Sequence, residues 1–202
     1  MSVITISRQF GAGGKTIGEM VSRKLGYLFF DDQIIQMIAA RARVSPGWVK
    51  SIEREAGGML QKFILSVGRK SFAERISEEG GYIDEEIYID LLNTIITKIA
   101  SEGNVVILGR GGQYILRDFS DAYHVLIVAD KADRIKFIEN RYGFSTRRAT
   151  QVVDRQEKRR INLYRKFGKE DYETPGLYHL ILNTSKLSIE RACEHICMLV
   201  QH

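Results

Sequence analysis

A glycine-rich loop between a β-branched run and a helical pattern is the feature that most constrains how this chain folds. Residues 2–7 alternate as a strand does, residues 11–16 read GAGGKT, and apolar residues then recur at helical spacing up to residue 25. Glycines let the backbone curl so that several N–H groups face one anion, and a following helix adds the positive end of its dipole. The layout predicts a phosphate-binding loop after the first strand of an α/β domain.

The loop carries side chains that suit a bound triphosphate. Lys15 brings a mobile cation to the phosphates, and the hydroxyl of Thr16 can bind Mg²⁺. The strict pattern GxxxxGK[ST] fits Gly14, Lys15 and Thr16 but would place its first glycine at Gln9. The match is therefore partial.

A dinucleotide-binding loop is the competing interpretation. Its pattern GxGxxG fits Gly11 and Gly13 and fails at Thr16, while Asp31 lies 20 residues beyond Gly11, where a ribose-binding acid is expected. Phosphate transfer is favoured because a dinucleotide loop has no role for Lys15.

Composition and length are those of one globular domain over residues 1–202. The chain is 44% hydrophobic and 27% charged, which is enough for a full α/β core. No apolar run approaches the ~20 residues of a membrane span, and no signal peptide precedes the first strand. We therefore expect a cytoplasmic protein without a membrane partner.

The positive charge is concentrated in one segment. The net charge is +5, yet residues 141–169 alone hold ten Lys or Arg against Asp154 and Glu157. Such local basicity indicates an anion site, and we interpret residues 141–172 as a basic lid. A solvated basic helix is one alternative. RNA binding, with Tyr164 and Phe167 as stacking rings, is another, but no RNA-binding signature is present, so we expect no nucleic-acid partner.

Five apolar runs alternate with helical patterns along the chain. Strands are expected at residues 2–7, 27–30, 105–108, 123–128 and 178–182, with helices between them and a helical insert at 44–83. This order predicts a three-layer α/β sandwich, with a five-stranded parallel sheet covered by helices on both faces. Ligands bind outside the carboxyl ends of such strands, where one cleft would collect the loop at 11–16, Asp31, Arg110 and Asn183.

The succession of motifs resembles the cytidylate kinase-like family, a branch of the nucleoside monophosphate kinases. The motifs are ITISR at 4–8, GAGG at 11–14, FFD at 29–31, GRGG at 109–112, DRQEKRR at 154–160 and LNTSKLS at 182–188. The resemblance implies a P-loop kinase that uses ATP and Mg²⁺ to phosphorylate a small nucleotide, CMP or dCMP.

The resemblance also implies roles for individual residues. ATP would be held by Arg8, Gly11, Ala12, Gly13, Gly14, Lys15, Thr16, Thr184 and Ser185, with Thr16 also a Mg²⁺ ligand. The acceptor nucleotide would contact Asp31, Arg110 and Asn183. Catalytic charge would come from Lys15, Arg155, Arg159 and Arg160. On one helix Arg155 and Arg159 share a face, whereas Arg160 lies about 100° round from Arg159.

Three departures from that family's pattern support a second hypothesis. The well-characterised enzymes read GxGKGT, and this chain has Gly14 at the lysine position with Lys15 one place later. Leu108 and Asn183 stand where those enzymes carry acids. A nucleotide-binding sensor or interaction protein with little or no kinase activity is therefore the alternative. Residues 44–83 are expected to shape the acceptor pocket, and residues 68–82 are a candidate surface for self-association.

Overall fold

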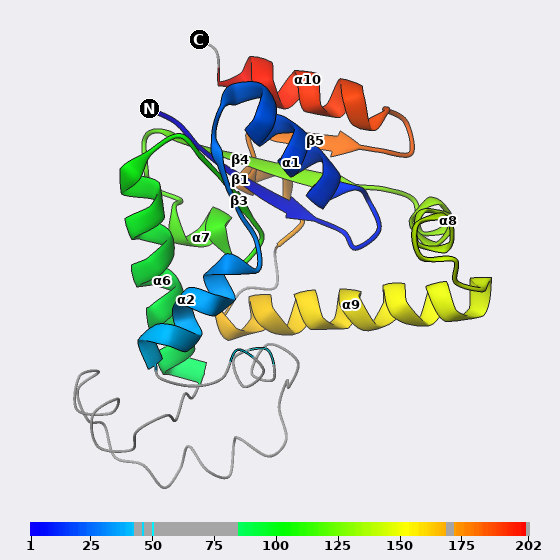
Figure 1. The fold of residues 1–202 in the computed structure, drawn as a ribbon, viewed down its shortest axis with the longest axis horizontal. Helices are drawn as coiled ribbons and strands as arrows, with labels where there is room; N and C mark the ends of the chain where they lie inside the picture. Colours follow the sequence, from blue (N-terminus) through cyan, green and yellow to red (C-terminus); the bar gives the residue numbers. More distant parts are fainter. Residues whose placement is uncertain (43–45, 47–49, 51–84, 169–171, 201–202) are drawn as a thin grey trace, which may run out of the picture.

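Five parallel strands form the centre of the molecule. The computed structural model describes residues 1–42, 46, 50, 85–168 and 172–200. The strands lie in the order β2-β3-β1-β4-β5 (Figure 1), and every pairing is parallel. Their bounds are β1 Val3–Arg8, β2 Leu28–Phe30, β3 Val105–Leu108, β4 Ala122–Val128 and β5 Leu180–Asn183. The predicted parallel sheet is confirmed.

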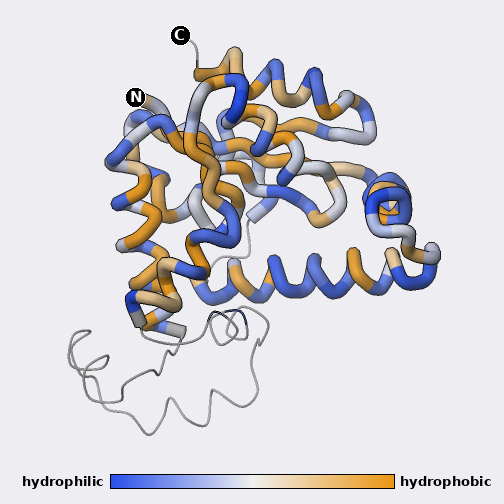
Figure 2. Tube along the Cα trace, in the orientation of Figure 1, coloured by the Kyte–Doolittle hydropathy of each residue, from blue (hydrophilic) through white to orange (hydrophobic). Residues whose placement is uncertain are grey.

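Helices cover both faces of this sheet. On one face α1 (Gly14–Leu25) and α10 (Ile189–Leu199) pack against Ile4 and Ile6, and on the other α2 (Gln33–Ala42) and α6 (Glu85–Glu102) pack on the side of Val3. Alternate residues of β1 thus enter opposite cores, as expected for a strand buried on both faces. Figure 2 shows the apolar stripe that each layer turns inward. The predicted three-layer sandwich is confirmed.

A pair of helices, α8 and α9, stands beside these layers (Figure 1). α8 (Lys131–Tyr142) follows β4, and α9 (Thr146–Lys166) runs back toward the layer that holds α2 and α6. A small apolar cluster with Ile138, Ala149 and Val153 at its centre joins the two helices. Ser145 caps α9 by accepting a hydrogen bond from the N–H of Arg148. Within the segment 141–172, which was interpreted as a basic lid, residues 146–166 form one continuous helix.

Most differences between the expected and observed elements are at their ends. Helix α1 begins at Gly14 rather than at residue 16, and β5 begins at Leu180 rather than at 178. Two short elements were not expected from the sequence. They are α7 (Gly112–Ile115), a single turn that is too short to show a period, and the 3₁₀ helix Pro175–Leu177. The predicted insert at 44–83 and the candidate self-association surface at 68–82 lie almost entirely outside the described residues. None of the helices described is both long and apolar enough to cross a membrane.

Candidate active site

A pocket of about 690 Å³ opens at the carboxyl edge of the sheet. It is lined by the loop after β1, the residues that follow β2 and β3, and side chains of α8 and α9. Its volume falls in the range of small-molecule sites. One cleft was predicted to collect the loop at 11–16, Asp31, Arg110 and Asn183. The lining includes Asp31, Arg110 and the loop residues other than Ala12, but it does not include Asn183.

The first turn of α1 leaves backbone donors available at this pocket. Gly11 and Gly13 have φ of 89° and 79°, a left-handed conformation that glycine adopts without strain. Gly13 caps α1 with no side-chain hydrogen bond, and the first turn carries no acid. The N–H groups of Gly14, Lys15 and Thr16 therefore have no acceptor within the helix. They suit a phosphate anion, and the Thr16 hydroxyl on the same pocket suits Mg²⁺ bound with a nucleotide.

Positive charge dominates the rest of the lining. Two acids, Asp31 and Asp32, accompany seven described basic residues, namely Arg8, Lys15, Lys50, Arg110, Arg141, Arg159 and Arg160. This excess is what a site for a polyanion requires. Within the ranges that the structure describes, no group of three His, Cys, Asp or Glu side chains is arranged to hold a metal ion by itself.

The two acids each bind basic side chains that also line the pocket. Lys15 Nζ lies 3.1 Å from Asp31 Oδ2, and this hydrogen bond and charge raise the pKa of Lys15. Asp32 Oδ1 lies 3.3 Å from an Nη of Arg110, and Asp32 Oδ2 lies 3.8 Å from Lys50 Nζ. Asp31 and Arg110, both predicted to face the acceptor, are thus brought to one side of the pocket.

Arg110 has an unusual backbone conformation. Its φ is 59°, between Gly109 at 73° and Gly111 at 74°, so three successive residues are left-handed. A side chain in that conformation costs about 1–2 kcal/mol relative to glycine. Strain of this kind gathers at functional sites, and here it turns an arginine from the end of β3 into the pocket.

The rotation of α9 decides which lid residues reach the pocket. Gln156, Arg159, Arg160, Leu163 and Tyr164 line it, at the spacing of one helical face. Arg155 is exposed and does not line the pocket, because it lies outside the arc of the helix that these five residues span. The pocket thus includes Arg159 and Arg160, and not Arg155, which was expected to share a face with Arg159. Packing of Ala149 and Val153 against α8 sets this rotation. Arg155 is therefore removed from the residues that we assign to the site.

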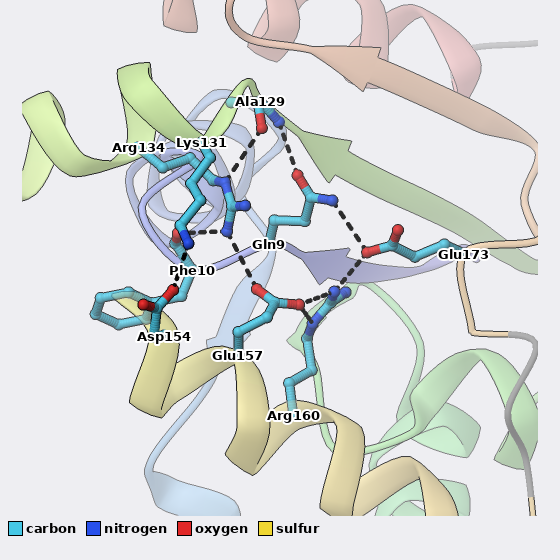
Figure 3. Close-up of polar contacts among 9 residues, drawn as sticks. All are labelled: Gln9, Phe10, Ala129, Lys131, Arg134, Asp154, Glu157, Arg160 and Glu173. Carbon is cyan, nitrogen blue, oxygen red and sulfur yellow. Dashed lines mark hydrogen bonds and ion pairs between the residues drawn. The ribbon is translucent and has the colours of Figure 1, made fainter. Parts of the chain in front are cut away.

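Behind the lid, buried ions join α9 to the phosphate loop (Figure 3). Arg134 on α8 donates to the backbone oxygens of Ala129, at 3.1 Å, and Phe10, at 3.4 Å, and forms an ion pair with Glu157 at 3.1 Å. Glu157 also accepts from Arg160 Nε at 3.0 Å. Arg134 is only 8% exposed, so it acts as an internal brace rather than as a surface cation.

Gln9 and Glu173 complete this network. The Gln9 side chain accepts from the Ala129 N–H at 3.1 Å and donates to Glu173 at 3.0 Å, and Glu173 also binds Arg160 (Figure 3). Burial opposes ionisation of Glu173, but the hydrogen bonds from Arg160 and Gln9 hold its pKa below the usual value. Hydrogen bonds and ion pairs thus connect the start of the loop at Gln9, helix α9 and Glu173.

The residues at the end of β5 and just after it, Asn183 to Ser185, do not lie beside Asp31 and Arg110. Thr184 Oγ1 lies 3.0 Å from the Ala12 oxygen and 3.2 Å from the Val128 oxygen, and the Ser185 hydroxyl accepts from the Asp130 N–H at 2.8 Å. Asn183 accepts from the Ser185 N–H at 2.9 Å and does not line the pocket. Because β5 and β2 are opposite edges of the sheet, Asn183 is separated from Asp31. The structure does not bring these two predicted acceptor residues together.

Sequence reasoning missed four members of the network, namely Gln9, Arg134, Glu157 and Glu173. The spacing of Glu157 and Arg160, three residues apart on a helix, was a readable signal for an ion pair. Arg134 and Glu173 gave no such signal, because their partners lie on other elements.

Comparison with known proteins agrees with this geometry. The sequence profile of the Cytidylate kinase-like family matches residues 3–186. The chain belongs to this family. A cytidylate kinase from Pyrobaculum calidifontis is 27% identical over 189 residues, which cover 94% of this chain and 87% of that protein. A cytidylate kinase from Roseiflexus castenholzii is 51% identical over 41 residues, which cover 20% of the present chain and 18% of the Roseiflexus protein.

Solved structures with a similar fold include P-loop kinases. An uncharacterized protein from Eubacterium ventriosum has a TM-score of 0.67 at 18% identity, over 99% of this chain and 98% of that one. Shikimate kinase from Bacteroides thetaiotaomicron has a TM-score of 0.51 at 17% identity, over 100% and 99% of the two chains. These likenesses show that this member of the cytidylate kinase-like family has a P-loop kinase fold.

Proposed function

We propose that this protein transfers the terminal phosphoryl group of ATP to a nucleoside monophosphate such as CMP or dCMP. The observation that carries the proposal is a single pocket lined by the phosphate loop, by Asp31 and Arg110, and by the lid arginines. Membership of the cytidylate kinase-like family and the P-loop kinase fold support phosphoryl transfer in general. We further propose that residues 1–202 act as one domain, with an acceptor-side insert at 44–83 and a lid at 141–172.

The donor half of the site is assigned to the loop after β1. The N–H groups at the start of α1 bind the phosphates of ATP, and the glycines allow the backbone to approach them closely. Mg²⁺, when bound with ATP, would neutralise oxygens of the β- and γ-phosphates. Thr16 is the residue that would hold it through its hydroxyl. Thr184 supports the loop through its hydrogen bond to the Ala12 oxygen, although neither Thr184 nor Ser185 lines the pocket itself.

The acceptor half is assigned to the ends of β2 and β3. Arg110 offers a planar guanidinium that can bind a monophosphate through two hydrogen bonds, and Asp31 positions Lys15 beside it. In the reaction an acceptor oxygen forms a bond to the γ-phosphorus while the bond to the bridging oxygen breaks and ADP leaves. Lys15, Arg159 and Arg160 stabilise the charge of the group in transfer. Enclosure by α9 keeps water from accepting the phosphoryl group.

One observation favours a second candidate, a nucleotide-binding sensor with little turnover. Leu108, 1% exposed, lines the pocket at the end of β3, where the well-characterised cytidylate kinases resembled by this chain carry an acid. A leucine supplies no ligand for Mg²⁺ or its waters. Such a protein would bind Mg²⁺ and ATP and release no ADP.

An acceptor screen tests the proposal directly. Purified protein with Mg²⁺ and ATP is offered nucleoside monophosphates and small metabolites, ADP release is followed in a coupled assay, and the product is identified by mass. We expect one monophosphate to stimulate ADP release. Arg160→Ala should reduce this release by more than about tenfold, and the exposed Arg117→Ala should not. Binding of ATP without ADP release for any acceptor would favour the sensor. Tight binding of RNA that saturating ATP does not reduce would contradict both candidates.

A further inference from the structure

The side chain of Arg8 fills the space into which a residue at position 14 would project. A Cβ added to Gly14 would lie 2.7 Å from Arg8 Cβ and 2.8 Å from its Cγ, closer than side chains tolerate. Arg8 ends β1, and Gly14 begins α1. The stem of Arg8 therefore crosses the loop at the position where the family pattern GxGKGT has its lysine.

The guanidinium of Arg8 continues from there into the pocket. It lies against Gly109, where an added Cβ would collide with its Nη1. Burial lowers the pKa of Arg8, which is further influenced by the charges of Asp31 and Arg110. Among the residues that the structure describes, this guanidinium has no hydrogen bond or ion pair, although it lines the pocket beside the first turn of α1. The Arg8 guanidinium is thus a cation next to the N–H groups at the start of α1, which have no acceptor within the helix.

Motif matching would assign the donor phosphates to Lys15, but the ammonium of Lys15 is paired with Asp31. Its ammonium lies 3.1 Å from the Asp31 carboxylate at the end of β2, and its side chain is 57% exposed. A lysine on the first turn of α1 that binds the acid after β2 belongs to the acceptor side. The donor phosphates then need another cation.

We propose that Arg8 supplies this cation and takes over the role of the phosphate-loop lysine. The inference rests on the proposed function, because it requires that a triphosphate binds at this loop. Gly14 and Gly109 are the two positions whose lack of a side chain gives Arg8 its path. A guanidinium presents several N–H groups in one plane, so Arg8 can bind two phosphate oxygens at once, whereas lysine acts as a point charge. The absence of a lysine at position 14 thus reflects a rearranged phosphate site, in which Arg8 replaces that lysine, and not a lost one.

Calorimetry with Mg²⁺ and adenylyl imidodiphosphate separates the two cations. The proteins are the full-length wild type, Arg8→Met, Lys15→Met and, as a matched control, Arg117→Met, whose side chain is exposed and outside the pocket. We expect Arg8→Met to weaken binding at least about tenfold, and Lys15→Met to weaken it less. Arg117→Met should bind as the wild type does. Far-ultraviolet circular dichroism checks that each variant is folded.

The outcomes distinguish this inference from the proposed function. If the wild type does not bind the analogue, the proposed function is wrong and the inference with it. If the wild type binds but Arg8→Met binds equally well, or Lys15→Met loses more, the role of Arg8 alone is overturned. Should Arg8→Met not fold, the Arg8 Nε–H signal of the ¹⁵N-labelled wild type, assigned with Arg8→Lys, gives the answer. It should shift when the analogue is added, and an unmoved signal refutes the contact.

Discussion

Replacing Gly11 with alanine should distort the phosphate loop through its contact with α8. The Cβ of the new residue would lie 2.8 Å from the backbone oxygen of Arg134 and 2.9 Å from its Cβ, and neither atom belongs to a flexible side-chain end. The φ of 89° adds the strain of a left-handed alanine, about 1–2 kcal/mol. Overpacking typically costs a further ~1–3 kcal/mol.

Gly26 provides the matched control for this prediction. It is also left-handed, with φ of 70°, but a Cβ there meets nothing within 4 Å. Gly26→Ala should therefore lower the free energy of unfolding only by the strain of a left-handed alanine. Gly11→Ala should lower it by about 1–3 kcal/mol more, because of the added contact with Arg134. Urea unfolding followed by circular dichroism measures both values, with equal m values confirming comparable transitions. Equal stabilities for the two variants would show that the loop does not rest on the backbone of Arg134.

Three further predictions concern charged or titratable side chains. Glu157→Gln, which removes the charge that binds Arg134 and Arg160, should lower the free energy of unfolding by about 1–3 kcal/mol in urea, whereas Glu102→Gln, at an exposed glutamate, should change it little. Arg160→Ala should reduce turnover by more than about tenfold, equivalent to ~1.4 kcal/mol of transition-state stabilisation, and Arg147→Ala, at an exposed position on the same helix, should not. His124, 4% exposed, is held neutral because burial and then His179 lower its pKa to about 4. The unfolded state therefore binds the extra proton, so stability should be full above pH 6.5 and fall by about 3 kcal/mol toward pH 4, and His124→Asn should reduce this pH dependence.

The strands and the loop could be predicted because their signals are local. Residues 105–108 form an uninterrupted apolar run, and the structure buries all four as β3. The cap at Ser188 has a local basis of the same kind, since its hydroxyl accepts from the N–H of Arg191 three residues later. The local elements that were not expected are the short ones, α7 and the 3₁₀ helix Pro175–Leu177.

The site depended on information that is not local. The rotation of α9 follows from contacts of Ala149 and Val153 with α8, and among so many charges the sequence could not show which arginines face inward. The pairs Thr184 with Ala12 and Gln9 with Glu173 join residues that are 172 and 164 positions apart. Motif matching identified Lys15 as the phosphate cation, but it could not detect that Asp31 binds this lysine.

The left-handed backbone at Arg110 has a consequence for how this protein can be engineered. Glycine at position 110 would adopt φ of 59° freely and would relieve about 1–2 kcal/mol. A library screened only for heat resistance should therefore enrich glycine at this position while losing the guanidinium that we propose binds the acceptor. Selection for thermal stability favours glycine at position 110, and selection for activity favours arginine. A useful screen must therefore test stability and activity together.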